Sequence, residues 1–269
     1  MRSTRVIERE DSAGSVCCHP AGLSLNHTEA RHNGAGVRMV RKHVLRWIGS
    51  TALLLGVLVL GCRGKPEAGE ETVEVMLPAA RIASEVSLEE AIAARRSVRV
   101  YEQTSLALQD LAQLLWAAQG ITAEWGGRAA PSAGTTYPLE VYVVTGAVKG
   151  LRSGIYRYLP DNHSATLVKE GDLRAALSSA ALGQEWVRTA PASLVIAAAY
   201  GRTTRQYGER GERYVHMEVG HVGQNVYLQA AALALGTVMV GEFDDTEVKE
   251  LLETDEEPLA IMLAGRPAG

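Results

Sequence analysis

Three arginines and a serine fall within five residues of the sequence, at Arg95, Arg96, Ser97 and Arg99. Guanidinium groups are planar, permanently charged donors, which suit phosphate oxygens and the carbonyl edges of a ring system. The alternative is that these cations follow a helix, cap its last carbonyl groups and interact favourably with its dipole. Taken alone, the cluster is compatible with either interpretation.

Two further stretches could complete an anion site. The loop of residues 131–138 contains small residues that let the backbone approach a flat ligand and offer it N–H groups. Arg266 follows an apolar run, from which its side chain could reach an anion beyond the edge of a sheet. Each stretch alone could be an ordinary surface feature, so it is their order and shared chemistry that carry meaning.

The elements that must position these residues follow from the hydrophobic pattern. Residues 87–94 predict a helix start with a capping box, in which Ser87 accepts from the backbone of Glu90 and Glu90 reaches back. Its apolar face consists of Leu88, Ala91 and Ile92. Periodicity and alternation predict helices at 108–119, 173–182, 212–235 and 246–252, and strands at 139–144, 154–158, 164–168, 193–199, 237–240 and 258–264. Helices and strands alternate irregularly, which predicts an α+β fold.

The helix predicted at 212–235 carries Glu218 and His221 at the spacing of carboxylate-bridged metal sites. Such sites need two copies of the motif. The folded part of the sequence contains a single copy, so we expect no metal here. We interpret the two residues as a hydrogen-bonded pair at a dimer interface. No cysteine follows Cys62, which excludes disulfides, thiol catalysis and cysteine-ligated metals from the folded part.

Several of these segments, in this order, resemble the nitroreductase superfamily of FMN enzymes. The resemblance begins at 87–92, runs through the arginines at 95–99 and continues over 113–122. Residues 131–142, the segment from His221 to Asn225, and the segment from Pro258 to Pro267 are similar to its SagB-type dehydrogenase branch. The resemblance covers essentially all of residues 87–269.

The resemblance implies an FMN-dependent nitroreductase-like fold, with a mixed central sheet flanked by helices and a domain-entwined homodimer that binds FMN at the subunit interface. Arg95 and Arg99 would hold the FMN phosphate and ribityl chain, with Arg96 and Ser97 assisting. Arg266 would close on the phosphate. The other implied flavin contacts are Pro131, Ser132, Ala133 and Gly134 along the isoalloxazine ring, Gly241 and Glu242 at its other edge, and Gln184 nearby.

The resemblance also implies an oxidoreductase that shuttles hydride through flavin N5 to or from a small organic substrate, with NAD(P)H as a candidate electron donor. Such chemistry belongs mostly to the cofactor, consistent with the absence of an obvious acid–base dyad or triad. Azoline-oxidising members of the branch resemble one another in a Lys-Tyr pair, where this chain has Gln206 and Tyr207. Glutamine cannot act as a base. Tyr207 is therefore the remaining catalytic candidate, and a stand-alone reductase or dehydrogenase is expected.

The first part of the chain has the organisation of a leader. Residues 1–38 lack periodicity, and we interpret them as disordered or as an upstream extension, so that Met1 or Met39 is the true start. Basic residues after Met39 and an apolar run over 47–60 end at Cys62, which resembles a lipoprotein signal with Cys62 as the lipidated residue. A plain cleaved signal or membrane anchor is the alternative.

Residues 63–86 are rich in glycine, proline and acids and predict a tether, which leaves residues 87–269 as one domain. We therefore expect an exported, membrane-anchored lipoprotein on the periplasmic side or at the cell surface. Of the 27 basic residues, 19 follow Cys62, and of the 31 acidic residues, 27 do. The part of the chain after Cys62 therefore has a net charge of about −8, which argues against nucleic-acid binding. The alternative function is a lipid-anchored flavin-binding or sensor protein without turnover.

Overall fold

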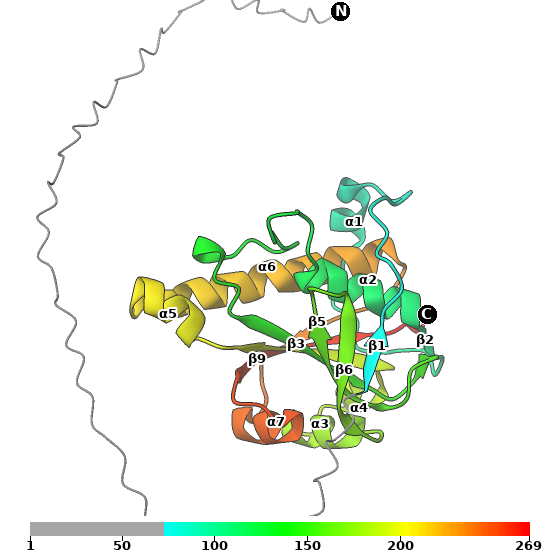
Figure 1. Cartoon of the computed structure of the whole chain (residues 1–269). Helices are drawn as coiled ribbons and strands as arrows, with labels where there is room; N and C mark the ends of the chain where they lie inside the picture. Colours follow the sequence, from blue (N-terminus) through cyan, green and yellow to red (C-terminus); the bar gives the residue numbers. More distant parts are fainter. Residues whose placement is uncertain (1–72) are drawn as a thin grey trace, which may run out of the picture. The chain divides into compact units, whose positions relative to one another are not determined.

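A seven-stranded sheet forms the centre of the computed structural model, which describes residues 73–269. In sheet order the strands are β1 (Glu74–Met76), β6 (Ser164–Glu170), β5 (Gly154–Leu159), β3 (Leu139–Thr145), β7 (Ala192–Ala198), β9 (Glu257–Ala264) and β8 (Met239–Val240). The helices are α1 (Leu88–Ala94), α2 (Leu108–Gln119), α3 (Arg174–Ala180), α4 (Glu185–Thr189), α5 (Gly201–Tyr207), α6 (Arg210–Ala232) and α7 (Asp245–Leu252). Helices α2 and α6 cover one face of the sheet, and α3, α4 and α7 cover the other (Figure 1).

The central strands β3 and β7 are mostly apolar because helices bury both of their faces. In β3, Val143 packs in the core beneath α2 and α6, whereas its neighbours Tyr142 and Val144 pack in the core on the opposite face. The same alternation places Leu194 and Val195 of β7 in different cores. A strand covered on both sides has no polar face, which explains the uninterrupted apolar runs in the sequence.

The predicted helices α1, α2, α3, α6 and α7 and the predicted strands β3, β5, β6, β7, β8 and β9 are confirmed, with ends shifted by a few residues. The capping box of α1 is also confirmed, since Ser87 Oγ accepts from Glu90 N at 3.1 Å and Glu90 Oε2 accepts from Ser87 N at 2.8 Å. Helices α4 and α5 were not predicted: α4 has five residues, and the sequence of α5, GRTTRQY, has no apolar stripe at helical spacing.

The α+β class is confirmed, but the expected mixed sheet differs in one respect. Every strand pairing of the described central sheet is antiparallel. The parallel pairing joins β2 (Leu106–Ala107) and β4 (Val148–Lys149) in a separate ladder. The turn at 160–163 makes β5 and β6 antiparallel, because so short a link cannot form a parallel crossover.

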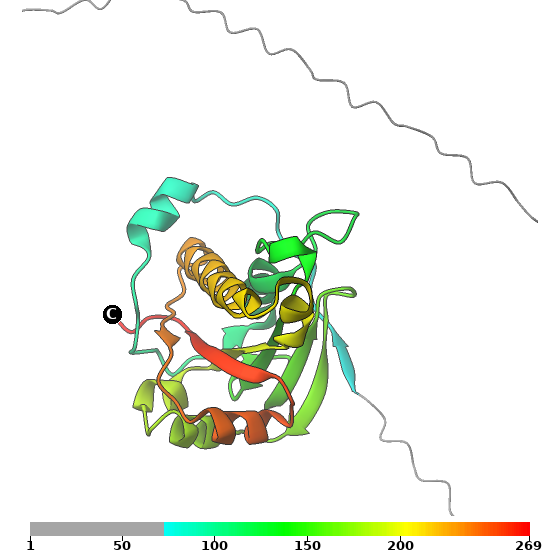
Figure 2. The same cartoon turned by 90° about the vertical axis from the view of Figure 1, so that its left-hand side faces the viewer.

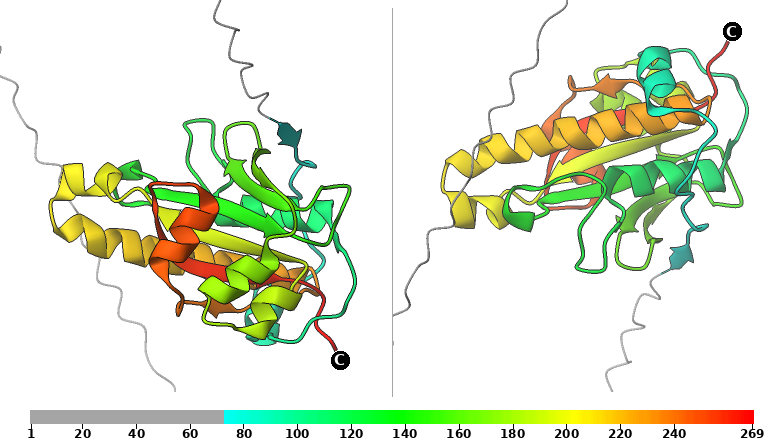
Figure 3. Two further views of the ribbon diagram at one scale, coloured as in Figure 1. Left: turned by 90° about the horizontal axis from the view of Figure 1, so that it is seen from below. Right: turned by 90° about the horizontal axis from the view of Figure 1, so that it is seen from above.

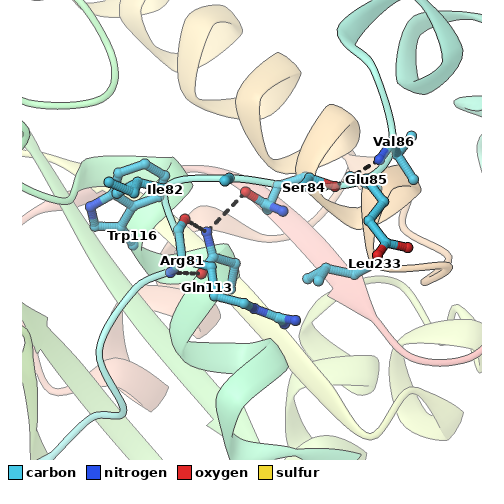
Figure 4. Close-up of a pocket in the computed structure, with 11 residues that line it drawn as sticks. Arg81, Ile82, Ser84, Glu85, Val86, Gln113, Trp116 and Leu233 are labelled. Atoms are coloured by element: carbon cyan, nitrogen blue, oxygen red, sulfur yellow. Dashed lines mark hydrogen bonds between the residues drawn. The ribbon is translucent and has the colours of Figure 1, made fainter.

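Part of the predicted tether belongs to the folded unit. Strand β1 pairs with β6 at the edge of the sheet, and Leu77 is buried. Arg81 N donates to Gln113 Oε1 at 2.7 Å, and Gln113 Nε2 donates back to Arg81 O at 2.9 Å, so the segment is tied to α2 (Figure 4). These bonds are long-range, and a three-residue edge strand leaves no periodic signal in the sequence. The predicted segments 1–38 and 39–62, with Met39 and Cys62, lie outside the described residues.

Helix α1 lies apart from the sheet, against the end of α6 (Figure 2). Of its predicted apolar face only Ala91 is buried, while Leu88 and Ile92 are 60% and 53% exposed. Val100, a few residues later, is 66% exposed. The helix therefore presents apolar side chains that nothing in residues 73–269 covers.

Candidate functional site

The three arginines that follow α1 have different surroundings. Arg96 donates through Nη1 to two carbonyl oxygens at the end of α1, each at 2.8 Å, so its guanidinium caps the helix. Arg95 lies over the ring of Tyr227, 5.1 Å from its centroid, and Arg99 lies 5.9 Å from the ring centroid of Trp186. The helix-cap interpretation therefore applies to Arg96 only. Within residues 73–269, no hydrogen-bond acceptor engages the guanidinium of Arg95 or Arg99.

Tyr227 of α6 connects Ser97 to the edge of the sheet. Its hydroxyl lies 3.3 Å from Ser97 Oγ and accepts a hydrogen bond from Met239 N at 2.8 Å. The backbone of Ser97 bridges that of Thr237, just before β8. These contacts fix the position of Ser97 between α1 and the sheet.

Arg266 reaches the same region through backbone pairing. Segment 97–101 is bridged to residues 237 and 267, and residue 236 is bridged to residue 265. Glu102 N donates to Arg266 O at 2.9 Å. The chain after α1 therefore runs beside the C-terminal end of the protein (Figure 2), so the two segments that carry the predicted arginines are neighbours.

The loops around α4 and β8 add the remaining predicted polar contacts. Gln184 Nε2 donates to Glu242 O at 2.8 Å, and Gln184 is the residue just before α4, which carries Trp186. We call this group the arginine cluster; it consists of Arg95, Ser97, Arg99, Gln184, Gly241, Glu242 and Arg266.

Two buried donors at the arginine cluster have no hydrogen-bond partner in the described residues, Trp186 Nε1 and Thr237 Oγ1. Buried polar groups of native proteins are nearly always paired, since an unpaired one costs free energy. Together with guanidiniums that lack an acceptor, these donors fit a ligand that is rich in oxygen or nitrogen acceptors.

The predicted ring loop lies elsewhere, against the first half of α6 (Figure 3). Its start is held by Asn225 Nδ2, which donates to Ala117 O at 3.1 Å and to Ala129 O at 3.2 Å. Thr136 and Thr203 share a hydrogen bond of 2.8 Å, which joins the loop to α5. The loop borders a cavity of about 260 Å³, which we call the loop cavity. Its lining consists of Pro131, Ser132, Ala133, Tyr214, Met217, Glu218 and His221.

Tyr207, the catalytic candidate, lies beside this loop. A Cβ on Gly134 would meet the Tyr207 hydroxyl, and Gly134 has a left-handed backbone with φ of +57°. The ring of Tyr207 packs edge-on against Tyr214, with centroids 5.1 Å apart. The left-handed backbone at position 134 therefore favours glycine, and a larger residue there would displace the Tyr207 hydroxyl.

Glu218 differs from its interpretation as a partner of His221. Its side chain is 2% exposed, and its Oε1 accepts from Gln119 Nε2 at 3.4 Å. Arg128 Nη1 donates to Gln119 Oε1 at 3.0 Å, so Arg128 is linked to Glu218 through the amide of Gln119. Burial raises the pKa of the Glu218 carboxyl, while the hydrogen bonds of Ser132 and Gln119 and the charge of Arg128 oppose the shift. No group of three metal-binding side chains is found in residues 73–269.

The arginine cluster and the loop cavity do not converge within one protomer. Tyr227, beneath Arg95, and Glu218, in the wall of the loop cavity, are nine residues apart on α6. At 1.5 Å per residue this corresponds to about 14 Å along the helix. The arginine cluster and the loop cavity therefore lie at different levels along α6, and we call them the two half-sites. A larger cavity of about 520 Å³ under residues 81–86 contains none of the predicted flavin contacts (Figure 4).

Comparison with known proteins identifies the family. The model of the nitroreductase family matches residues 92–266. The chain belongs to the nitroreductase family. The nitroreductase homologue MJ1384 of Methanocaldococcus jannaschii is 49% identical over 196 residues, which are 73% of this chain and 98% of that protein.

Solved structures agree with this membership. A nitroreductase-family protein of Ralstonia eutropha superposes with a TM-score of 0.64 at 33% identity, over 73% of this chain and 90% of its own. One from Anabaena variabilis gives a TM-score of 0.65 at 29% identity, and this chain spans 42% of its length. The nitroreductase-like fold is confirmed, and family members generally use a flavin and NAD(P)H, so this nitroreductase-family chain is a flavin-type oxidoreductase.

Sequence reasoning missed several residues that support the site in this nitroreductase-family chain. Tyr227 could have been noticed as an aromatic residue just outside the apolar stripe of α6, whereas Trp186 lies in a helix too short to be predicted. The described helices include none of the length and apolar character that crossing a bilayer requires.

Proposed function

We propose that the protein is an FMN-dependent oxidoreductase of the SagB-type dehydrogenase branch, which transfers hydride between a donor such as NAD(P)H and a small organic substrate. The arginine cluster is the observation that carries the proposal. A phosphate monoester has nearly two negative charges at neutral pH and needs several cationic donors. Backbone bridges bring the segments that carry Arg95, Arg99 and Arg266 side by side, and none of the three guanidiniums has an acceptor among residues 73–269, which supports the proposal.

The donors at the cluster fit FMN as its ligand. Arg95, Arg99 and Arg266 would bind the phosphate, with Ser97 as a further donor. Trp186 Nε1 and Thr237 Oγ1 are buried donors that lack partners among the described residues and match a ligand with many acceptor atoms. When bound, FMN would supply two-electron chemistry at N5, and the protein would supply orientation and hydrogen bonds.

A homodimer is part of the proposal, because one protomer separates the two half-sites by about 14 Å along α6. In a dimer, the loop cavity of one protomer would face the arginine cluster of the other. The exposed Leu88 and Ile92 of α1 support this arrangement, since apolar side chains left uncovered on one helix are typical of an interface.

The loop of residues 131–134 would form the wall against the flavin ring. Proline, serine, alanine and glycine leave the backbone accessible, so N–H groups can approach a flat ring without obstruction by long side chains. Tyr207 stands beside this wall, but Gln206 precedes it where azoline-oxidising relatives would have lysine. A free-standing reductase or dehydrogenase is therefore favoured over a peptide-azoline dehydrogenase.

Location outside the cytoplasm, on a membrane, is proposed from the sequence of residues 39–62. A basic segment, an apolar segment and Cys62 follow one another as in lipoprotein signals. Labelled palmitate incorporated into the wild-type chain but not into Cys62→Ser would support the anchor. Equal labelling of both would refute it.

The flavin proposal is tested by the visible spectrum of the full chain, purified in mild detergent. We expect flavin absorbance that hydride donors bleach and that a quinone or nitroaromatic acceptor restores. A colourless protein that cannot be reconstituted with FMN would refute the proposal. A bound flavin that no donor or acceptor changes would favour the flavin-binding sensor.

A further inference from the structure

Glu218 is a buried carboxyl at the edge of a cavity. It is 2% exposed, yet it lines the loop cavity together with Pro131, Ala133 and Met217. Its hydrogen bond from Gln119 is long, at 3.4 Å. A buried carboxyl is costly in its charged form unless donors surround it, so this environment favours the protonated acid.

The groups that face Glu218 do not neutralise it directly. In the part of the chain that the structure describes, no basic nitrogen lies within 4.0 Å of its carboxylate. The charged and titratable groups around it are Arg128, which hydrogen-bonds Gln119, and His221, on the same helix. Burial raises the pKa of the Glu218 carboxyl despite both.

His221 provides a connection to solvent. It lies three residues after Glu218, on the same face of α6, and lines the same loop cavity. Unlike Glu218, it is exposed. Glu218 and His221 therefore both border the loop cavity, Glu218 as a buried side chain and His221 as an exposed one.

We propose that Glu218 is the proton donor to a substrate bound in the loop cavity and that His221 restores its proton from solvent. The inference rests on the proposed function, since that function supplies the hydride. It assigns to this chain an acid that neither the family membership nor the sequence motifs identify.

The proposed step is balanced. An acceptor X=Y takes a hydride from reduced flavin, which forms one new bond to hydrogen and leaves a negative charge on the other atom. Glu218 gives that atom its proton, and the product is HX–YH. The Glu218 carboxylate then takes a proton from the His221 imidazolium, which regains one from water. The two electrons come from the hydride, and the protein is unchanged after the cycle.

The lining of the cavity defines the substrate class. Its volume of about 260 Å³ lies just below the roughly 300–1,000 Å³ typical of drug-sized ligand sites, and Pro131, Ala133 and Met217 make it largely apolar. The apolar lining disfavours charged ligands. The expected acceptors are therefore uncharged, single-ring compounds that gain a proton with the hydride, such as quinones, nitroaromatics or conjugated carbonyl compounds.

The test compares two acceptors in the flavin-loaded enzyme. Benzoquinone needs a proton, whereas ferricyanide takes electrons alone. We expect Glu218→Gln to slow reoxidation by benzoquinone about 100-fold, at the lower end of general-acid effects, and to leave reoxidation by ferricyanide within twofold of wild type. His221→Gln, at an exposed position, should slow the quinone reaction because the return of a proton to Glu218 is slower. Glu212→Gln, an exposed residue of the same helix, is the matched control and should change neither rate.

A second measurement does not depend on activity. NMR of the protein with carbon-13 labelled glutamate identifies the Glu218 carboxyl as the resonance that disappears in Glu218→Gln. The pKa obtained from the titration of this resonance should lie above the usual range for glutamate. A titration in the usual range would overturn the inference, as would unchanged quinone rates or equal slowing with both acceptors. A wild-type protein that binds no flavin would overturn the proposed function and this inference together. If Glu218→Gln left flavin turnover intact, this inference would be overturned and the proposed function would stand.

Discussion

Arg266→Ala is the substitution that tests the phosphate site most directly. Arg266 is exposed, and the contact that holds it in the fold is made by its backbone, since Arg266 O accepts from Glu102 N at 2.9 Å. Alanine keeps this hydrogen bond. The variant should therefore fold normally and lose only the guanidinium.

The expected effect follows from the strength of a charged hydrogen bond. Such a bond contributes about 1.5–3 kcal/mol, which corresponds to a Kd for FMN that is roughly 10- to 150-fold weaker. Arg95→Ala should weaken FMN binding by a similar factor. It also removes the contact of the Arg95 guanidinium with the Tyr227 ring, 5.1 Å from the ring centroid. Contacts of that type contribute about 0.5–1 kcal/mol at exposed sites, so this variant should also be slightly less stable.

The assay is titration by quenching of flavin fluorescence, with FMN and with riboflavin, which lacks the phosphate. Arg266→Ala should weaken FMN binding and leave riboflavin binding unchanged. Arg96→Ala is the control, because the Arg96 guanidinium already donates to two carbonyl oxygens at 2.8 Å. It should change the affinity for FMN less than twofold.

Two outcomes would refute the reasoning. If Arg266→Ala weakened FMN and riboflavin equally, the arginine would not act on the phosphate. If Arg95→Ala and Arg266→Ala both bound FMN as tightly as wild type, the arginine cluster would not be the phosphate site at all.

Three further predictions concern stability and are checked by urea unfolding. Gly134→Ala should lower the free energy of unfolding by about 1–2 kcal/mol, the cost of a left-handed backbone, because the Tyr207 hydroxyl that the new Cβ meets is the end of a side chain that can move. Gly150→Ala, with φ of +80° and open space, should cost a similar amount, and a much larger loss for Gly134→Ala would contradict this. Burial raises the pKa of Glu218 in the folded state, so the unfolded state loses its proton first as the pH rises. The free energy of unfolding of wild type, relative to that of Glu218→Gln, should therefore be highest below a pH of about 4.5 and fall as the pH rises through the folded-state pKa. A difference that stays constant with pH would contradict this. Leu115→Ala, at a position 1% exposed in the α2–α6 core, should cost about 2–5 kcal/mol, and a loss below 1 kcal/mol would contradict the packing.

Local signals predicted much of the fold correctly. The capping box of α1, the apolar stripe of α6 and the apolar run of β7 each depend on residues close in sequence, and each element is found where it was predicted. Strand β1 was missed, because its stability comes from pairing with β6 about ninety residues away. Helix α4 was missed because its five residues span little more than one turn, too few for an apolar stripe to repeat.

For the site, the sequence by itself determined which chemical groups are present: arginines for an anion, a small-residue loop for a flat ring, and the family to which they belong. Only the tertiary structure decided where their side chains lie. It placed Arg266 beside the chain that follows α1, used Arg96 as a helix cap, and buried Glu218 next to a cavity. The physical reason is that residue type fixes charge and shape, whereas burial and proximity depend on contacts between segments far apart in the chain. Those contacts separate the ring loop from the arginines by about 14 Å along α6, a spacing that no local pattern encodes.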